Sequence, residues 1–159
     1  MSSLESLEKK LKEPFPEKIV HFRVGSMSKD KTKGIALAYI DARDVMKRLD
    51  QVVGFSNWSD SYEETPSGRL FCCLSIRIDG EWIDKVDGAG DTNVEGAKGG
   101  ISDSFKRAAV KWGIGRYLYY LPTTWVTLNK FKQIENPPKL PSWALPTKSQ
   151  PSVDMSSWS

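Results

Sequence analysis

The sequence predicts an α+β fold in which an antiparallel β-sheet packs on helices. Segments of alternating apolar and polar residues are joined by short turns such as Asp79-Gly80, a pattern typical of β-hairpins. Two longer segments, 42–53 and 94–112, instead place apolar residues three and four positions apart, which indicates amphipathic helices. The 159 residues, of which 39% are hydrophobic, suit a single domain with a tail.

The N-terminal segment is predicted to be a short helix followed by a linker. Its apolar residues fall on one helical stripe, and Pro14 prevents the helix from continuing past Glu13. The stripe consists of Leu4, Leu7 and Leu11. We therefore assign residues 1–17 to a helix and linker that dock on the body or on a neighbouring subunit.

A β-hairpin is predicted next, because strands Ile19–Val24 and Ile35–Ile40 flank a polar turn over residues 28–34. The lysines of this turn serve either solubility or contact with phosphate groups. They are Lys29, Lys31 and Lys33.

The helix over residues 42–53 begins after Asp41, a typical N-cap residue, and ends at Gly54. Its apolar face comprises Val45, Met46, Leu49, Val52 and Val53. The basic residues expected on the opposite, solvent-facing side are Arg43, Lys47 and Arg48.

A meander of three strands follows, over Trp58–Thr65, Arg69–Ile78 and Glu81–Val86. Cys72 and Cys73 are adjacent and lack the spacing of a zinc or redox motif, so we expect them to pack in the core.

The last core helix, Val94–Trp112, follows the glycine-rich segment 88–93 and stops at Gly113. A buried stripe is predicted for Ile101, Phe105, Ala108 and Trp112. Lys106, Arg107 and Lys111 point away from that stripe. The predicted core, residues 18–135, thus has the order β-β-α-β-β-β-α.

Residues 136–159 are rich in proline and serine, and we expect them to form a largely disordered tail. Trp143 and Trp158 are unusual in such a segment, and they belong either to a docking peptide or to an inert tail.

The sequence lacks the motifs that several classes of enzyme require. The chain has one histidine, His21, and no phosphate-binding loop of the type G-x-x-x-x-G-K-[ST]. We expect no cofactor and no metal. No secretory signal and no run of the roughly 20 apolar residues of a membrane span are present, so we expect a cytoplasmic protein with no membrane partner.

The charges alternate in blocks. Residues 18–53 and 96–116 each carry a net charge of +4, and residues 54–95 between them carry −6. The basic blocks form either a footprint for a polyanion or ordinary solvated faces. The last basic block adds aromatic residues that either stack on unpaired bases or pack in the core. Its cations are Lys98, Lys106, Arg107, Lys111 and Arg116, and its tyrosines are Tyr117, Tyr119 and Tyr120.

A carboxylate cluster offers a competing interpretation. Asp84, Asp87, Asp91 and Glu95 lie within twelve residues and have the ligand chemistry to hold Mg²⁺ for a nuclease. Their spacing does not form a known calcium loop, so we favour a solvated hairpin or a subunit contact.

Several short motifs resemble the Rad52 family of single-strand annealing proteins over about residues 18–121. They are Tyr39-Ile40-Asp41 before a helix, Gly54-Phe55-Ser56-Asn57-Trp58 after it, Asp87-Gly88-Ala89-Gly90, and Ser102-Asp103-Ser104-Phe105-Lys106-Arg107-Ala108. In size the chain is most similar to the phage recombination proteins of the Sak type. The family shares the β-β-α-β-β-β-α core.

The resemblance implies an ATP-independent protein that forms homo-oligomeric rings and anneals complementary strands in recombination and double-strand break repair, in a bacterial or phage-infected cell. In this family the Lys-Arg pair lines an inner DNA groove, which implies Lys106 and Arg107. Lys98 matches a residue of a second, outer site. The expected partners are single-stranded DNA, further copies of the chain and a single-strand-binding protein.

Two departures weaken the outer site. Family members often carry basic residues where this chain has Val110 and Asp44, although Lys111 and Arg43 are adjacent to them. The DNA-binding residues are therefore expected to be Lys106 and Arg107, with Lys98, Lys111, Arg43 and Arg116 as secondary contacts. The alternatives are a strand-protecting or scaffolding oligomer without annealing, and the metal-dependent nuclease.

Overall fold

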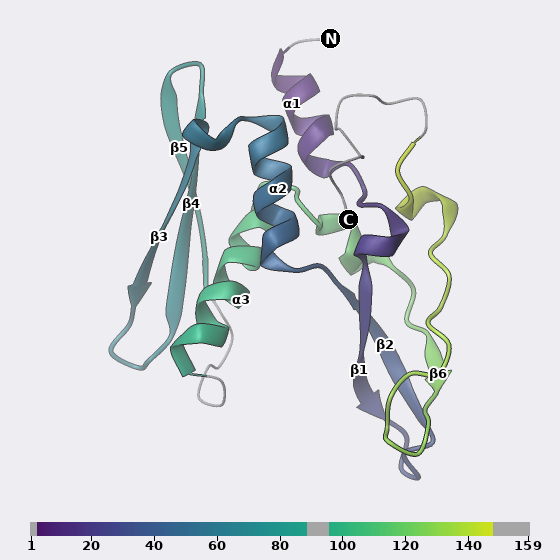
Figure 1. Cartoon of the computed structure of the whole chain (residues 1–159). Coiled ribbons are helices and arrows are strands. Elements are labelled where there is room, and N and C mark those ends of the chain that lie inside the picture. The colour runs from purple at the N-terminus through teal and green to yellow at the C-terminus, as the bar shows by residue number, and fades with distance from the viewer. Residues whose placement is uncertain (1–2, 89–95, 148–159) are drawn as a thin grey trace.

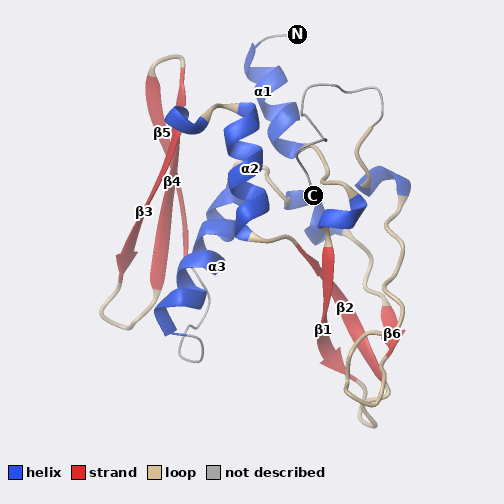
Figure 2. Ribbon diagram, in the orientation of Figure 1, coloured by secondary structure: helices blue, strands red, loops and turns tan. Residues whose placement is uncertain are grey.

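The computed structural model describes residues 3–88 and 96–147 (Figures 1 and 2). Its helices are α1 (Ser3–Lys12), α2 (Ala42–Val52) and α3 (Gly96–Lys111), with short 3₁₀ turns η1 (Glu17–Ile19), η2 (Phe55–Asn57), η3 (Arg116–Tyr120) and η4 (Ser142–Ala144). Its strands are β1 (His21–Met27), β2 (Lys33–Tyr39), β3 (Trp58–Glu64), β4 (Leu70–Ile78), β5 (Glu81–Gly88) and β6 (Trp125–Thr127). The predicted α+β class is confirmed.

The strands form two antiparallel three-stranded sheets, with the orders β1-β2-β6 and β3-β4-β5. Figure 1 shows them on opposite sides of α2 and α3, with β1-β2-β6 extending away from the body. Strand β6, which the sequence did not predict, pairs with the part of β2 nearest the hairpin turn. In the described residues, no helix is both long and apolar enough to cross a membrane.

One part of the hydrophobic core lies between α3 and one face of the β3-β4-β5 sheet, and the core continues to α1 and α2. Cys72, Leu74 and Ile76 alternate along β4 and are fully buried, and Phe105 and Ala108 of α3 are buried with them. This confirms the period of two in the predicted strand and the core position of Cys72, whereas Cys73, also expected in the core, is only partly buried.

Ile101 departs from the predicted buried stripe, since its side chain is 44% exposed. Near the N-terminal end of α3, among the residues whose burial is described, Gly100 and Ser104 are buried and Ile101 is not. The buried face at this end is therefore centred to one side of the predicted stripe through Ile101 and Phe105. Ile101 therefore lies at the edge of the covered face.

Arg48 corrects the prediction for the second helix. Its side chain is fully buried rather than solvent-facing, and it donates hydrogen bonds to the carbonyl oxygens of Lys10 (3.4 Å), Leu11 (3.1 Å) and Glu13 (2.6 Å). Its guanidinium carbon lies 4.1 Å from the centre of the Phe15 ring. The last carbonyl groups of a helix have no partner within the helix, and Arg48 supplies the donors for the end of α1.

The segment after residue 135 begins as part of the folded body. Leu140 and Ala144 are buried in the core, and the backbone N–H groups of Leu140 and Thr147 donate to the carboxylates of Glu17 (3.4 Å) and Glu13 (3.1 Å). Residues 136–147 therefore pack where the sequence predicted the start of a disordered tail. Residues 148–159, with Trp158, lie outside the described residues, and the domain boundaries stay predictions.

Candidate nucleic-acid interface

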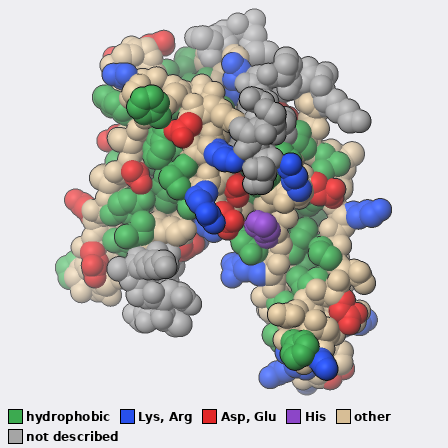
Figure 3. Space-filling view, viewed as in Figure 1, with side chains coloured by type: hydrophobic (Ala, Val, Ile, Leu, Met, Phe, Trp, Pro, Cys, Tyr) green, Lys and Arg blue, Asp and Glu red, His purple; other side chains and the backbone are tan. Residues whose placement is uncertain are grey.

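A groove of about 400 Å³ runs between the β1-β2 hairpin on one side and α3 with η3 on the other. We call it the hairpin groove. Its charged residues come from three separate stretches of chain: Arg23 of β1, Asp103, Lys106 and Arg107 of α3, and Lys139. Four of these five side chains are basic, so the groove has the charge that a phosphate backbone requires. Figure 3 shows basic side chains on this face where the hairpin meets the helices.

Lys106 is fixed between α3 and the end of β2. Its ammonium group donates a 3.1 Å hydrogen bond to the carbonyl oxygen of Ile40 and lies 5.7 Å from the centre of the Tyr39 ring. These contacts use one of the three donors of the ammonium group, and the half-buried stem is held against the groove wall. The cation is therefore placed before any ligand arrives.

Arg107, the next residue, is more open. Its Nε lies 3.9 Å from the carboxylate of Asp87 on β5, and nearly half of its side chain is exposed. A pair at this distance and exposure is weak, and phosphate is able to compete for it. Arg107 lines both the hairpin groove and a neighbouring hollow that also contains Arg116 and Tyr120.

Arg116 has a structural role at the end of α3. It donates to the carbonyl oxygens of Val110 (3.0 Å) and Lys111 (2.9 Å), the last acceptors of that helix. It nevertheless lines the hollow next to Arg107, so one side of its guanidinium lies at the surface where we expected a DNA contact.

The three tyrosines of η3 separate into two classes. Tyr117 packs against the core, its hydroxyl accepts a 2.9 Å hydrogen bond from the backbone of Phe15, and burial raises its pKa to about 12. Tyr119 and Tyr120 are 67% and 71% exposed. Tyr117 is thus a core residue, whereas Tyr119 and Tyr120 present faces on which bases are able to stack.

Two sequence-predicted contacts, Lys111 and Arg43, do not line the groove. Lys111 donates a hydrogen bond to the carbonyl oxygen of Val86 on β5, and Arg43 is exposed on α2 outside the groove lining. Lys98 belongs to α3, but its side chain lies outside the described part. The structure therefore brings together Lys106 and Arg107, with Arg116 beside them.

Two groove cations were not predicted from the sequence. Arg23 lies in β1, in a strand that reads as an ordinary half-buried hairpin, and Lys139 follows two prolines in the predicted tail. Their charges were visible in the sequence, but only the packing of the hairpin and of residues 138–141 against α3 places them opposite Lys106. For Arg23 the one signal in the sequence was the net positive charge of residues 18–53, and Lys139 lies outside that block.

The carboxylate cluster gains no support from the described residues. Asp84 accepts a hydrogen bond from Ser75 (2.5 Å) on the sheet face turned away from α3, whereas Asp87 lies opposite Cys72 on the covered face. Asp91 and Glu95 lie outside the described residues. Within the described ranges, no group of three or more histidine, cysteine, aspartate or glutamate residues gathers to hold a metal ion.

The Rad52/22 family double-strand break repair protein model matches residues 3–70 and 73–136. A single-stranded DNA-binding protein DdrA from Deinococcus deserti is 39% identical over 145 residues, covering 90% of this chain and 72% of the relative. Its counterpart from Deinococcus radiodurans is 34% identical over 151 residues, covering 90% and 69%. No solved structure matches significantly. The family match includes every groove cation except Lys139.

Proposed function

We propose a single-strand annealing function, from the premise that the chain belongs to the Rad52/22 family of double-strand break repair proteins. In this proposal the chain binds single-stranded DNA in the hairpin groove and promotes pairing of complementary strands in DNA repair, without ATP and without covalent chemistry. The finer likeness to phage proteins of the Sak type stays a prediction.

The observation that carries the proposal is the convergence of Arg23, Lys106, Arg107 and Lys139 on one groove. Cations fixed along a groove neutralise phosphates regardless of base sequence. Because Tyr119 and Tyr120 are exposed beside the groove, unstacked bases have aromatic faces to rest on. A strand held by its backbone keeps its base edges free for a second strand.

The proposal includes assembly into a ring of identical copies, which would join the grooves of neighbouring protomers into one track. A single-strand-binding protein is a further proposed partner, and a cytoplasmic location fits a DNA substrate. The secondary contacts are Arg116 beside Arg107, and Lys98, Lys111 and Arg43 at a proposed outer site.

An annealing time course tests the proposal. Two complementary labelled oligonucleotides are mixed with the purified chain, without ATP or metal ion, and pairing is followed against a sample without protein. We expect a large acceleration by the protein, because both strands are concentrated with their bases accessible. Pairing at the rate of the protein-free sample would reject annealing.

A strand-protecting binder is the second candidate, because the two relatives are named single-stranded DNA-binding proteins. The same samples separate the two functions when bound and free strands are resolved by native electrophoresis. Strands that are bound but remain unpaired would favour protection, whereas free strands would reject the groove as a DNA site.

The affinity for single-stranded DNA is expected to fall steeply with salt. If each of the four groove cations displaces a counterion from one phosphate, the logarithm of the association constant falls with the logarithm of salt concentration with a slope of about 3 per protomer. Fluorescence anisotropy of labelled oligo-dT over a salt series measures this slope. A flat response would mean that base stacking rather than phosphate contact dominates.

A further inference from the structure

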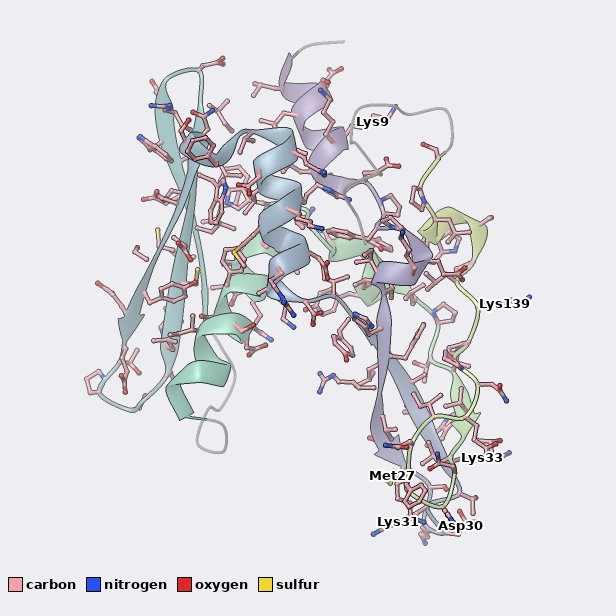
Figure 4. The ribbon with its side chains drawn as sticks, viewed as in Figure 1. Lys9, Met27, Asp30, Lys31, Lys33 and Lys139 are labelled. Atoms are coloured by element: carbon pink, nitrogen blue, oxygen red, sulfur yellow. The ribbon has the colours of Figure 1, made fainter. Side chains whose placement is uncertain are left out.

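A second basic surface lies at the far tip of the β1-β2-β6 sheet, distant from Lys106 and Arg107. It is formed by two turns, residues 27–33 and 128–134, which together contain five lysines and a single acidic residue, Asp30. The lysines, all exposed, are Lys29, Lys31, Lys33, Lys130 and Lys132. We call this surface the lysine tip. Figure 4 shows Lys31 and Asp30 at its end and Lys9 at the opposite end of the molecule.

The two turns are held side by side by the backbone. The N–H of Leu128 donates to the carbonyl oxygen of Thr32 (2.8 Å), and Lys33 pairs with Thr127 across β2 and β6. A β-bridge between Leu128 and Ile134 closes the second turn. Lysines almost a hundred residues apart in the sequence therefore form one surface rather than two solvated loops.

Side-chain hydrogen bonds make each turn rigid. The carboxylate of Asp30 accepts from the backbone and hydroxyl of Thr32 (3.0 and 2.7 Å) and from the hydroxyl of Ser28 (2.8 Å). The side-chain oxygen of Asn129 accepts from the backbones of Phe131 (2.8 Å) and Gln133 (3.0 Å). The one carboxylate within the tip is thus occupied in shaping its turn, and among the described residues no ion pair connects it to the lysines of the tip.

Two of the lysines occupy backbone positions that lysine does not favour. Lys31 has φ 60° and Lys132 has φ 64°, both in the left-handed region where glycine is free of strain. The third non-glycine residue with positive φ in the described ranges is Asp79, which belongs to a residue type that tolerates this region. Lys31 and Lys132 each end a four-residue turn, because their N–H groups donate to the carbonyl oxygens of Ser28 and Asn129. Glycine would adopt this backbone conformation without strain, so lysine at both places indicates that its positive charge has a function.

We propose that the lysine tip is a second contact for the phosphate backbone of single-stranded DNA, reached by the strand after it leaves the hairpin groove. The inference rests on the proposed function. Arg23 and Leu37, which pair across the hairpin, line the groove partway along the same strands that lead to the tip. Phe131, 68% exposed, adds an aromatic face beside the lysines for an unpaired base.

The double variant Lys31→Gly with Lys132→Gly tests this contact, because it removes two charges and also relieves the left-handed strain. We expect an unfolding temperature equal to or above that of the unaltered chain, together with weaker binding of long oligo-dT by about three- to tenfold. The salt slope is expected to decrease by about 1.4, which corresponds to two phosphates on a single strand. Binding of a short oligo-dT that fills only the groove is expected to be unchanged.

The matched control is Lys9→Gln with Lys18→Gln, which removes the same charge from α1 and η1 at residues that line neither the hairpin groove nor the lysine tip. Lys29→Gln with Lys130→Gln provides a second tip variant at positions without positive φ. Long oligo-dT bound equally by the tip variants and the control would overturn the inference while leaving the groove intact. If the unaltered chain bound no oligo-dT, the proposed function would fail and this inference with it.

Discussion

Replacing Lys106 and Arg107 together by alanine is expected to reduce the affinity for single-stranded DNA by at least about a hundredfold and to stop annealing. Each cation is expected to form a charge-assisted hydrogen bond with phosphate worth about 1.5–3 kcal/mol, and the two are adjacent in the groove. The salt slope is expected to fall by about 1.4 at the same time. Anisotropy with labelled oligo-dT and the annealing time course measure the three effects.

The double variant is expected to remain folded. Arg107 loses only a partly exposed contact with Asp87, and the loss of Lys106 frees the carbonyl oxygen of Ile40, which costs about 1 kcal/mol. Circular dichroism and thermal unfolding check this directly. Lys9→Gln with Lys18→Gln again serves as the charge-matched control and should bind as the unaltered chain does. A folded Lys106→Ala, Arg107→Ala protein that still anneals would show that the groove is not the DNA site.

Much of the fold was predictable because its signals are local. The alternation through Cys72, Leu74 and Ile76 predicted β4, and Asp41 predicted the start of α2, where its N–H indeed donates to the carboxylate of Asp44 (2.9 Å). Turn residues and helix periodicity depend on neighbours within a few positions, so one sequence contains them.

The errors concern contacts between distant segments. Arg48 lies at a polar position of its own helix, and only the carbonyl groups at the end of α1 explain its burial. Strand β6 is too short to show a pattern, and it exists because β2 offers an edge next to it. Leu140 and Ala144 are two apolar residues in a proline-rich segment, and their burial depends on the surface that receives them.

The candidate site was predicted in part for the same reason. Lys106 and Arg107 stand in a motif that resembles a family, so the sequence identified them directly. Arg23 and Lys139 carry no local signal, and they join the groove only through the packing of the hairpin and of residues 138–141 against α3. Helix periodicity placed Lys111 on the same solvent-facing side as Lys106, but the two ammonium groups bond to different elements, β5 and the end of β2.

Replacing Arg48 by methionine is expected to lower the free energy of unfolding by about 3–5 kcal/mol. Methionine retains an apolar stem, but three carbonyl oxygens at the end of α1 lose their donor and the buried Glu13 loses a nearby positive charge. Although burial lowers the pKa of Arg48 to about 10, the guanidinium is still charged at neutral pH. Urea unfolding followed by circular dichroism measures the change, and the melting temperature should fall by about 6–20 °C.

Two further variants test whether the guanidinium group of Arg48, rather than the size of its side chain, stabilises the fold. Arg43→Met changes an exposed arginine of the same helix and should alter stability by no more than about 0.5 kcal/mol. Arg48→Lys keeps the charge. Because one terminal nitrogen of Arg48, Nη1, makes all three bonds to Lys10, Leu11 and Glu13, an ammonium group is able to replace part of them, but it loses the flat guanidinium that stacks on Phe15. The stability of Arg48→Lys should therefore fall between that of Arg48→Met and that of the unaltered chain. If Arg48→Met is as stable as Arg43→Met, then the hydrogen bonds from Arg48 to the last carbonyl groups of α1 contribute nothing measurable to stability. The docking of α1 would then depend on the apolar contacts of Leu11 and Phe15 alone.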